Sequence, residues 1–154
     1  MPRFAANLSM MFCEYDFLDR FDAAAGAGFE AVEFLFPYDF DPDAITARLR
    51  KNRLTQALFN MPPGDFARGE RGLAVFPERR AEWREGIETA LRYVRATGAG
   101  RLHMMAGLAA PDSAVAEKSY RECLAEAADR LAAENLDLVI EPLNGRDTPG
   151  YFLN

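Results

Sequence analysis

Leu136-Asp137-Leu138-Val139-Ile140-Glu141 is a short apolar run that ends in a carboxylate. Because the run is short and a helical pattern precedes it, we expect a buried strand over residues 136–143. The helical pattern begins after Asp112 or Ser113, either of which suits the N-cap position. Its apolar stripe consists of Tyr120, Leu124, Ala127 and Leu131. One helix followed by one strand is the repeating unit that the sequence predicts.

The same unit recurs toward the N-terminus. Further strands are expected over residues 4–8, 31–36, 54–59 and 101–106. Helices are expected over residues 17–26, 42–52 and 77–97, the second with Asp41 as N-cap and Pro42 in its first turn. A long loop over residues 60–76 joins the third strand to the third helix, and loops of this length tend to be functional. Residues 144–154 are expected to form a loop.

The alternation of strands and helices predicts a parallel sheet with helical crossovers. Two architectures fit: an open doubly wound sheet, and part of a (β/α)8 barrel, of which this chain supplies about four and a half units. The pattern alone favours the open sheet. Strand order separates the two, because a doubly wound sheet changes direction at a switch point and a barrel does not. No linker divides the chain, so we expect one domain over residues 1–154.

Composition excludes several classes of function. The 24 acidic and 18 basic residues give a net charge of −6, which argues against a nucleic-acid groove. No apolar run approaches the ~20 residues of a membrane helix, and the N-terminus lacks the apolar core of a signal peptide. Because Cys13 and Cys123 form no C-x-x-C pair, we expect reduced thiols that serve packing in a cytoplasmic protein. His103 is the single histidine, which excludes a histidine-rich metal site within the chain.

Glu141 is the strongest candidate functional residue. A carboxylate at the C-terminal end of a buried parallel strand lies where such folds place their sites, and it would be costly to bury alone. Glu33 is a weaker candidate of the same kind, and pairing with a polar neighbour explains it equally well. His103 precedes the apolar residues 104–107, and either a hydrogen bond to a ligand or an ordinary buried role fits its position.

The long loop contains Gly69-Glu70-Arg71-Gly72, a charged pair between glycines. This segment suits a mobile loop that presents Arg71 to an anionic substrate, because a guanidinium matches a carboxylate with two hydrogen bonds. A solvated surface turn is the alternative. Two other segments resemble cofactor-binding motifs only superficially. Gly26-Ala27-Gly28 lacks the third glycine of a dinucleotide fingerprint. Met10-Met11-Phe12 suits the core or the lining of a barrel mouth.

Several segments in sequence order span essentially the whole chain: residues 4–12, 28–38 and 64–72, His103-Met104-Met105-Ala106-Gly107 and Ile140-Glu141-Pro142-Leu143-Asn144. Together they resemble the hydroxypyruvate isomerase family, which includes 2-oxo-tetronate isomerases. Members of that family are xylose-isomerase-like TIM barrels. The resemblance therefore implies the N-terminal part of a TIM barrel, about the first four and a half β/α units, rather than an open sheet.

The resemblance implies an isomerase that interconverts hydroxypyruvate and 2-hydroxy-3-oxopropanoate by metal-assisted proton transfer through an enediolate. The alternatives are a 2-oxo-tetronate isomerase acting on a four-carbon oxo acid and a non-catalytic half-barrel binding module. Glu141 matches a family glutamate that is both catalytic and a metal ligand, and Mg²⁺ or Mn²⁺ suits such oxygen-rich ligation. The expected substrate-binding residues are Asn60, Glu70, Arg71 and His103.

The resemblance also implies a second catalytic glutamate and two further metal ligands that have no counterpart in this chain. We therefore expect the chain alone to be inactive. A half barrel exposes sheet edges and apolar surface, so we expect association with another copy or with a missing C-terminal half. A small hydroxy-oxo acid is the expected substrate, with no nucleic acid or membrane as partner. An AP-site endonuclease, which resembles these barrels, would draw on several histidines, so the lone His103 argues against it.

Overall fold

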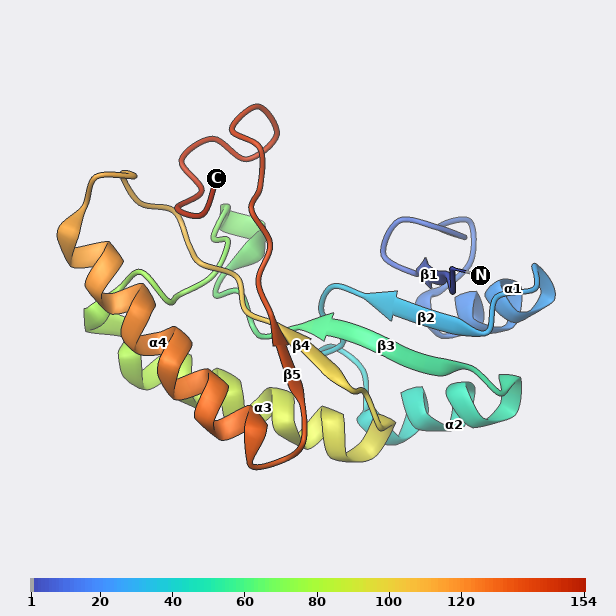
Figure 1. Ribbon diagram of the computed structural model, residues 1–154. Helices are drawn as coiled ribbons and strands as arrows, with labels where there is room; N and C mark the ends of the chain where they lie inside the picture. The colour runs from blue at the N-terminus through green and yellow to red at the C-terminus, as the bar shows by residue number, and fades with distance from the viewer. Residues whose placement is uncertain (1) are drawn as a thin grey trace. The chain divides into compact units, whose positions relative to one another are not determined.

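The computed structural model describes residues 2–154 and contains a parallel five-stranded sheet (Figure 1). Its strands are β1 (Ala5–Asn7), β2 (Ala31–Phe34), β3 (Thr55–Asn60), β4 (Arg101–His103) and β5 (Asp137–Val139). They are hydrogen-bonded in the order β1-β2-β3-β4-β5, with no switch in direction. This is the order of a barrel segment and not of a doubly wound sheet, so the fold implied by the family resemblance is confirmed.

Most of the strands are shorter than the apolar pattern predicts. The apolar residues 104–106 continue beyond β4 and are buried, but from Ala106 onward the backbone bonds outside the sheet. The carbonyl of Ala106 accepts from the amide of Val75 at 3.1 Å, and its amide donates to the Tyr151 hydroxyl at 2.8 Å. The amide of Met104 still donates to the carbonyl of Val139 in β5 at 3.0 Å, whereas at Ala106 the apolar pattern reflects burial and not ladder pairing.

The helices match the predicted positions closely. They are η1 (Phe17–Asp19) with α1 (Arg20–Gly26), α2 (Pro42–Asn52), η3 (Pro77–Arg79) with α3 (Arg80–Thr97), and α4 (Ala114–Ala132). The Asp41 side chain accepts from the amide of Asp43 at 2.8 Å, and the Ser113 side chain from the amide of Ala116 at 3.2 Å. Both expected N-caps are thus confirmed, with Ser113 in place of its alternative Asp112. Within residues 2–154, no helix is long and apolar enough to span a membrane.

The residues of the chain group into two compact units. The first consists of the residues up to Phe59 together with Leu91–Arg101, and the second of Asn60–Ala90 together with Leu102–Asn154. Helix α3 thus contributes its first half to one unit and its second half to the other. The prediction of one domain over residues 1–154 stays a prediction.

An aromatic cluster forms the core of the first unit. The ring of Phe17 lies 5.3 Å from that of Phe34 and 4.5 Å from that of Phe40, measured between centroids. The hydroxyl of Thr46 in α2 donates to the carbonyl of Ala96 at 2.9 Å, which ties α2 to the last turns of α3. Apolar burial and this buried hydrogen bond together hold the unit.

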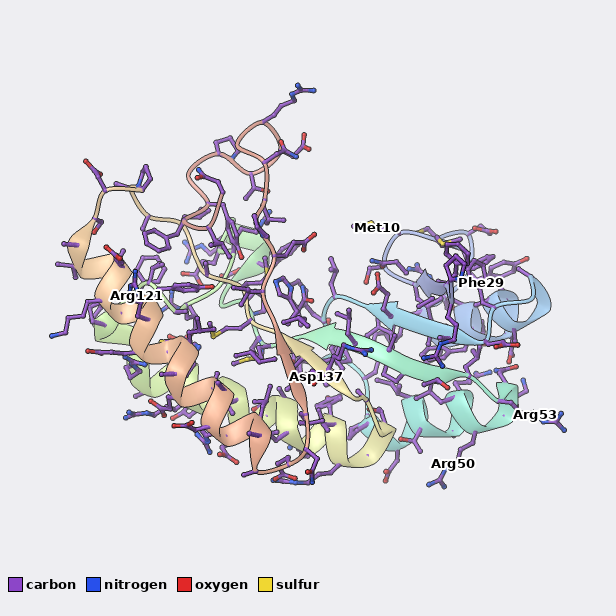
Figure 2. The ribbon with its side chains drawn as sticks, viewed as in Figure 1. Met10, Phe29, Arg50, Arg53, Arg121 and Asp137 are labelled. Carbon is purple, nitrogen blue, oxygen red and sulfur yellow. The ribbon has the colours of Figure 1, made fainter. Side chains whose placement is uncertain are left out.

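In the loop after β1, Met10 is 70% exposed (Figure 2) and Met11 is 38% exposed, so neither belongs to the core. Lining of a barrel mouth is the alternative that stays a prediction for these two residues. The expectation that Cys13 serves packing is wrong, because Cys13 is exposed. The loop turns back at once, with the amides of Met10 and Met11 bonded to the Asn7 carbonyl, which directs its side chains outward. Cys123, by contrast, is buried, and burial raises the pKa of its thiol to about 11.

In the second unit, α4 holds the end of the long loop that contains η2 (Phe66–Arg68). The carbonyl of Ala74 accepts from the Ser119 hydroxyl at 2.8 Å and from the Cys123 thiol at 3.4 Å. The C-terminal segment also folds back, since the amide of Phe152 donates to the carbonyl of Gly107 at 3.0 Å. The end of the long loop, the segment after β4 and the C-terminal segment are distant in sequence, and they therefore meet beyond the end of β4.

Candidate functional site

Asn60 and His103 are the last residues of the neighbouring strands β3 and β4. Both are buried, with 4% and 5% of their surface exposed. The Nδ1 atom of His103 lies 3.0 Å from the Oδ1 atom of Asn60. An amide oxygen only accepts hydrogen bonds, so Nδ1 carries the proton of this ring. The C-terminal ends of two parallel strands thus present one hydrogen-bonded pair, where barrel folds place their chemistry.

The second ring nitrogen of His103, Nε2, is buried and has no hydrogen-bond partner among residues 2–154. Burial lowers the pKa of His103, and the charge of Glu141 partly offsets this effect. The ring is therefore neutral at pH 7, with a proton on Nδ1 and a lone pair on Nε2. A buried acceptor that lacks a partner is uncommon, and it is available to a hydrogen-bond donor from a bound molecule.

Glu141 lies two residues beyond β5 and is exposed. The expectation that it ends a buried strand is therefore wrong. Within the described residues β5 pairs only with β4, so its other edge is open, and Ile140 is 42% exposed. The carboxylate still lies within electrostatic range of the site. Its charge opposes the lowering of the His103 pKa, and it adds to the effect of burial in raising the pKa of Tyr151.

Tyr151 is a component of this region that the sequence did not indicate. Its side chain is 1% exposed, and its hydroxyl accepts from the amide of Ala106 at 2.8 Å. Tyr151 also forms an isolated antiparallel bridge with Leu108. The sequence around it predicts only loop, because its contacts are long-range and no local periodicity reports them.

The long loop packs closely against the segment that follows β4 at Gly72. The mobility expected of the glycine-flanked segment stays a prediction. Gly72 is buried, and its amide donates to the carbonyl of Pro63 at 2.9 Å. Its φ of +114° favours glycine, and a Cβ atom there would lie 2.3 Å from the carbonyl oxygen of Met105. This glycine therefore permits close packing of the loop against the segment that follows β4.

Arg71 folds back onto its own loop. Its guanidinium donates to the carbonyls of Phe66 and Glu70, at 3.2 and 2.8 Å, and lies 3.9 Å from the centre of the Phe66 ring. These contacts are all with neutral groups, so they orient the guanidinium without cancelling its charge. Arg71 also lines a small hollow of about 140 Å³ together with Gly72, Phe76 and Leu108.

Glu70 braces the loop. Its carboxylate accepts from both terminal nitrogens of Arg79 and from the amide of Asp65, the latter at 2.5 Å. The hydrogen bonds from Arg79 and Asp65 hold the pKa of Glu70 below its usual range. Arg79 was not indicated by the sequence, because an arginine at the start of a helix carries no distinguishing pattern. These bonds occupy the carboxylate oxygens of Glu70. The substrate-binding role of Glu70 stays a prediction.

Glu33 belongs to the first unit and is half-buried. Its Oε1 atom accepts from the amide of the Asn7 side chain at 3.1 Å, and the two residues are also register partners in β1 and β2. A cross-strand hydrogen bond of this kind satisfies the carboxylate. The alternative explanation of Glu33, pairing with a polar neighbour, therefore agrees with the structure, in which Asn7 is that neighbour.

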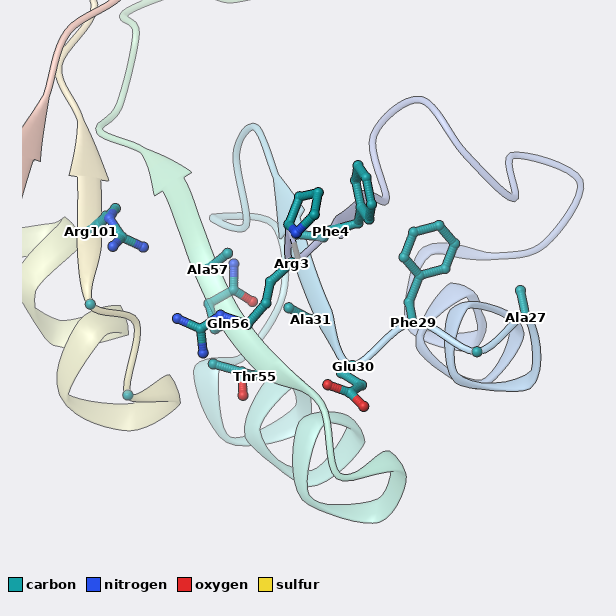
Figure 3. A pocket seen from close by; sticks show the side chains of 15 residues that line it. Arg3, Phe4, Ala27, Phe29, Glu30, Ala31, Thr55, Gln56, Ala57 and Arg101 are labelled. Atoms are coloured by element: carbon teal, nitrogen blue, oxygen red, sulfur yellow. The ribbon is translucent and has the colours of Figure 1, made fainter.

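A larger hollow of about 1030 Å³ lies within the first unit (Figure 3). Its lining includes Arg3, Thr55, Gln56 and Arg101, from the N-terminal ends of strands β1, β3 and β4. Conserved chemistry in parallel barrels belongs to the opposite, C-terminal ends. We therefore place the candidate site at Asn60, His103 and Glu141 and not in this hollow.

Nowhere within residues 2–154 do three or more histidine, cysteine, aspartate or glutamate side chains come together as a metal site requires. Glu141 is a hard oxygen donor of the type that Mg²⁺ and Mn²⁺ prefer, but these ions take about six such ligands. The described residues alone thus do not fit a complete metal site.

A parallel sheet in sequential order, with polar residues at its C-terminal strand ends, defines an α/β barrel of the TIM type. Comparison with solved structures agrees. A crystal structure from Brucella melitensis, described as an AP endonuclease of family 2, matches with a TM-score of 0.95 and 50% sequence identity. The match covers 99% of this chain and 60% of that one.

The family model described as xylose isomerase-like TIM barrel matches residues 21–154, and this chain belongs to that family. The 2-oxo-tetronate isomerase of Cupriavidus necator is 57% identical over 100% of this chain and 60% of its own length. The hydroxypyruvate isomerase of Escherichia coli is 46% identical over 99% of this chain and 60% of its own length. The predicted resemblance is thus confirmed, and the chain spans about 60% of the length of these curated relatives.

Proposed function

We propose that this chain forms the N-terminal part of an isomerase that acts on a short hydroxylated 2-oxo acid, 2-oxo-tetronate in preference to hydroxypyruvate. The observation that carries the proposal is the 57% identity to the Cupriavidus necator 2-oxo-tetronate isomerase over the whole chain. The identity to the Escherichia coli hydroxypyruvate isomerase is lower, at 46%. The four-carbon alternative is therefore favoured over the three-carbon substrate that the sequence resemblance first suggests.

The proposed reaction moves a hydrogen between adjacent carbons. A base removes the proton from the carbon beside the carbonyl, and the bonding electrons shift onto the carbonyl oxygen. The resulting enediolate takes a proton on the former carbonyl carbon, and the oxygen of that carbon takes a second proton to become a hydroxyl. The hydroxyl on the carbon that was first deprotonated loses its proton and becomes the new carbonyl, so the protons and electrons balance. We assign Glu141 as one group that takes or returns a proton, because it is exposed beyond a strand end and because the family resemblance implies that it corresponds to a catalytic glutamate.

We assign Arg71 to the substrate carboxylate. The neutral contacts with Phe66 and with two carbonyls orient its guanidinium and leave its positive charge uncancelled. A bound carboxylate would gain charge-assisted hydrogen bonds from it. The brace between Glu70 and Arg79 supports this role by holding the backbone that carries Arg71.

A divalent cation is proposed to complete the site, with Glu141 as one ligand and the others from outside these 154 residues. Mg²⁺ or Mn²⁺ would supply Lewis-acid stabilisation of the enediolate. The open edge of β5 and the exposed Ile140 favour association with a C-terminal barrel half or with a second copy of the chain.

The test is a chimera in which this chain is followed by the remaining part of the Cupriavidus necator relative. We expect turnover of both substrates, with a higher kcat/KM for 2-oxo-tetronate than for hydroxypyruvate. The 154-residue chain alone, assayed in parallel, is expected to be inactive. A folded chimera, checked by circular dichroism, that turns over neither substrate would contradict the proposal.

A further inference from the structure

We infer that Asn60 positions His103, and that Nε2 of His103 accepts a hydrogen bond from a hydroxyl group of the substrate. The inference rests on the proposed function for the nature of the substrate, a hydroxylated oxo acid. It also changes the role of Asn60, which is expected from the sequence to bind the substrate. Asn60 would act through His103 and not on the ligand.

The geometry of the pair sets the state of the ring. The Nδ1 atom of His103 is 3.0 Å from the Oδ1 atom of Asn60, and both residues are almost entirely buried. The proton must lie on Nδ1 for this contact to be a hydrogen bond, because Oδ1 has no proton to give. A neutral ring carries only one proton, so Nε2 is left as an acceptor.

The remaining acceptor determines the class of ligand group. Nε2 is buried without a hydrogen-bond partner among the described residues, so a bound molecule would have to donate to it. A substrate carboxylate or carbonyl has no proton to donate, whereas a hydroxyl has one.

This assignment orients the substrate within the second unit. The hydroxyl-bearing end would lie toward His103 and Glu141, and the carboxylate end toward Arg71. All of these residues belong to the second unit. The neutral hydrogen bond at Nε2 would then distinguish hydroxylated acids from their deoxy counterparts, since a ligand that lacks the hydroxyl leaves a buried acceptor unsatisfied.

The first experiment observes the tautomer directly. Because His103 is the single histidine, ¹⁵N-histidine labelling of the 154-residue chain gives signals from one ring only. We expect protonated Nδ1 and unprotonated Nε2 at neutral pH. Asn60→Ala should produce a tautomer mixture, and Asn60→Asp, which keeps an oxygen acceptor, should restore protonated Nδ1. Protonated Nε2 in the wild type, or the same tautomer in Asn60→Ala, would overturn the role of Asn60.

The second experiment measures binding of glycerate and of propanoate, which lacks the hydroxyls, to the chimera by calorimetry. We expect tighter binding of glycerate, and a fall in this preference of roughly two- to tenfold in His103→Phe, with propanoate affinity unchanged. The control is Trp83→Phe, which removes another buried group without a hydrogen-bond partner and should keep the preference. An unchanged preference in His103→Phe overturns the inference even if the chimera is an active isomerase. A lost preference in an inactive chimera supports the inference while the proposed function fails.

Discussion

Glu141 is exposed and lies two residues beyond β5. Replacing it by glutamine keeps the shape and one oxygen but removes the charge and the ability to exchange a proton. We expect Glu141→Gln to leave the thermal midpoint of the chimera unchanged and to lower kcat by at least ~10²-fold. Steady-state kinetics beside thermal melts check this prediction. Near-normal turnover would remove Glu141 from the chemistry.

Arg71 gives a second prediction at the scale of one side chain. Arg71→Ala removes the guanidinium proposed to hold the substrate carboxylate, a charge-assisted contact worth about 1.5–3 kcal/mol. We expect kcat/KM of the chimera to fall by about 10- to 150-fold. The matched control is Arg68→Ala in the same loop, because Arg68 is exposed and precedes the glycine-flanked segment. Equal losses from both variants would count against a specific role for Arg71.

The sequence indicates Glu141 and His103 as candidate site residues because each is a polar residue beside an apolar run, and parallel folds place their sites near such positions. Tyr151 is not identified, since its bond to Ala106 joins residues 45 apart in the chain. The exposure of Glu141 is likewise missed, because it depends on which strands flank β5 and not on the β5 sequence.

The packing of the long loop depends on one glycine, Gly72. In Gly72→Ala a new Cβ would approach the Met105 carbonyl oxygen to 2.3 Å, at a φ of +114° that alanine avoids. We expect a loss in the free energy of unfolding of about 2 kcal/mol or more. Gly100→Ala is the control, because a Cβ there meets nothing within 4 Å. Urea denaturation of both variants measures the difference, and equal stability would show that the loop is not packed in this way.

The brace between Glu70 and Arg79 makes the loop sensitive to acid. The pKa of Glu70 is lower in the folded chain than in the unfolded chain, so the unfolded state binds protons more readily as the pH falls. Its stabilisation is therefore complete above the unfolded pKa near 4.5 and is lost as the pH falls through the folded pKa. We expect Glu70→Gln to reduce stability at pH 6 by about 1 kcal/mol and to remove part of the acid dependence. Thermal or urea unfolding as a function of pH measures both effects, and Glu78→Gln, at an exposed position, is the control variant.

Element positions are predicted better than element lengths. Asp41 and Ser113 cap their helices through hydrogen bonds to residues two and three positions further on. Because both partners lie close together in the chain, the local sequence is enough to predict these helix starts. Strand ends depend instead on partners elsewhere in the chain. The residues after β4 are apolar enough to continue a strand, yet Val75 and Tyr151 take the hydrogen bonds of Ala106.

For the whole molecule, metal affinity should depend on completing the barrel. One carboxylate at the candidate site is too few ligands for a divalent cation, and the described residues contain no cluster of three. We expect the 154-residue chain to bind Mn²⁺ weakly and without defined stoichiometry, and the chimera to bind one ion more tightly. Calorimetric titration compares the two, with Glu141→Gln of the chimera as control. Tight stoichiometric binding by the chain alone would contradict the need for outside ligands.

The interleaving of the two units has a consequence for biosynthesis. Tyr93 belongs to the first unit but is synthesised after most of that unit. Its hydroxyl donates to the carbonyl of Phe40 at 2.7 Å, and its ring lies 5.2 Å from that of Tyr38. Residues 60–90, which belong to the other unit, leave the ribosome before it. At bacterial or eukaryotic synthesis rates this delay is on the order of seconds. The nascent N-terminal region therefore stays incomplete, with its aromatic residues accessible to chaperones, until the second half of α3 has emerged.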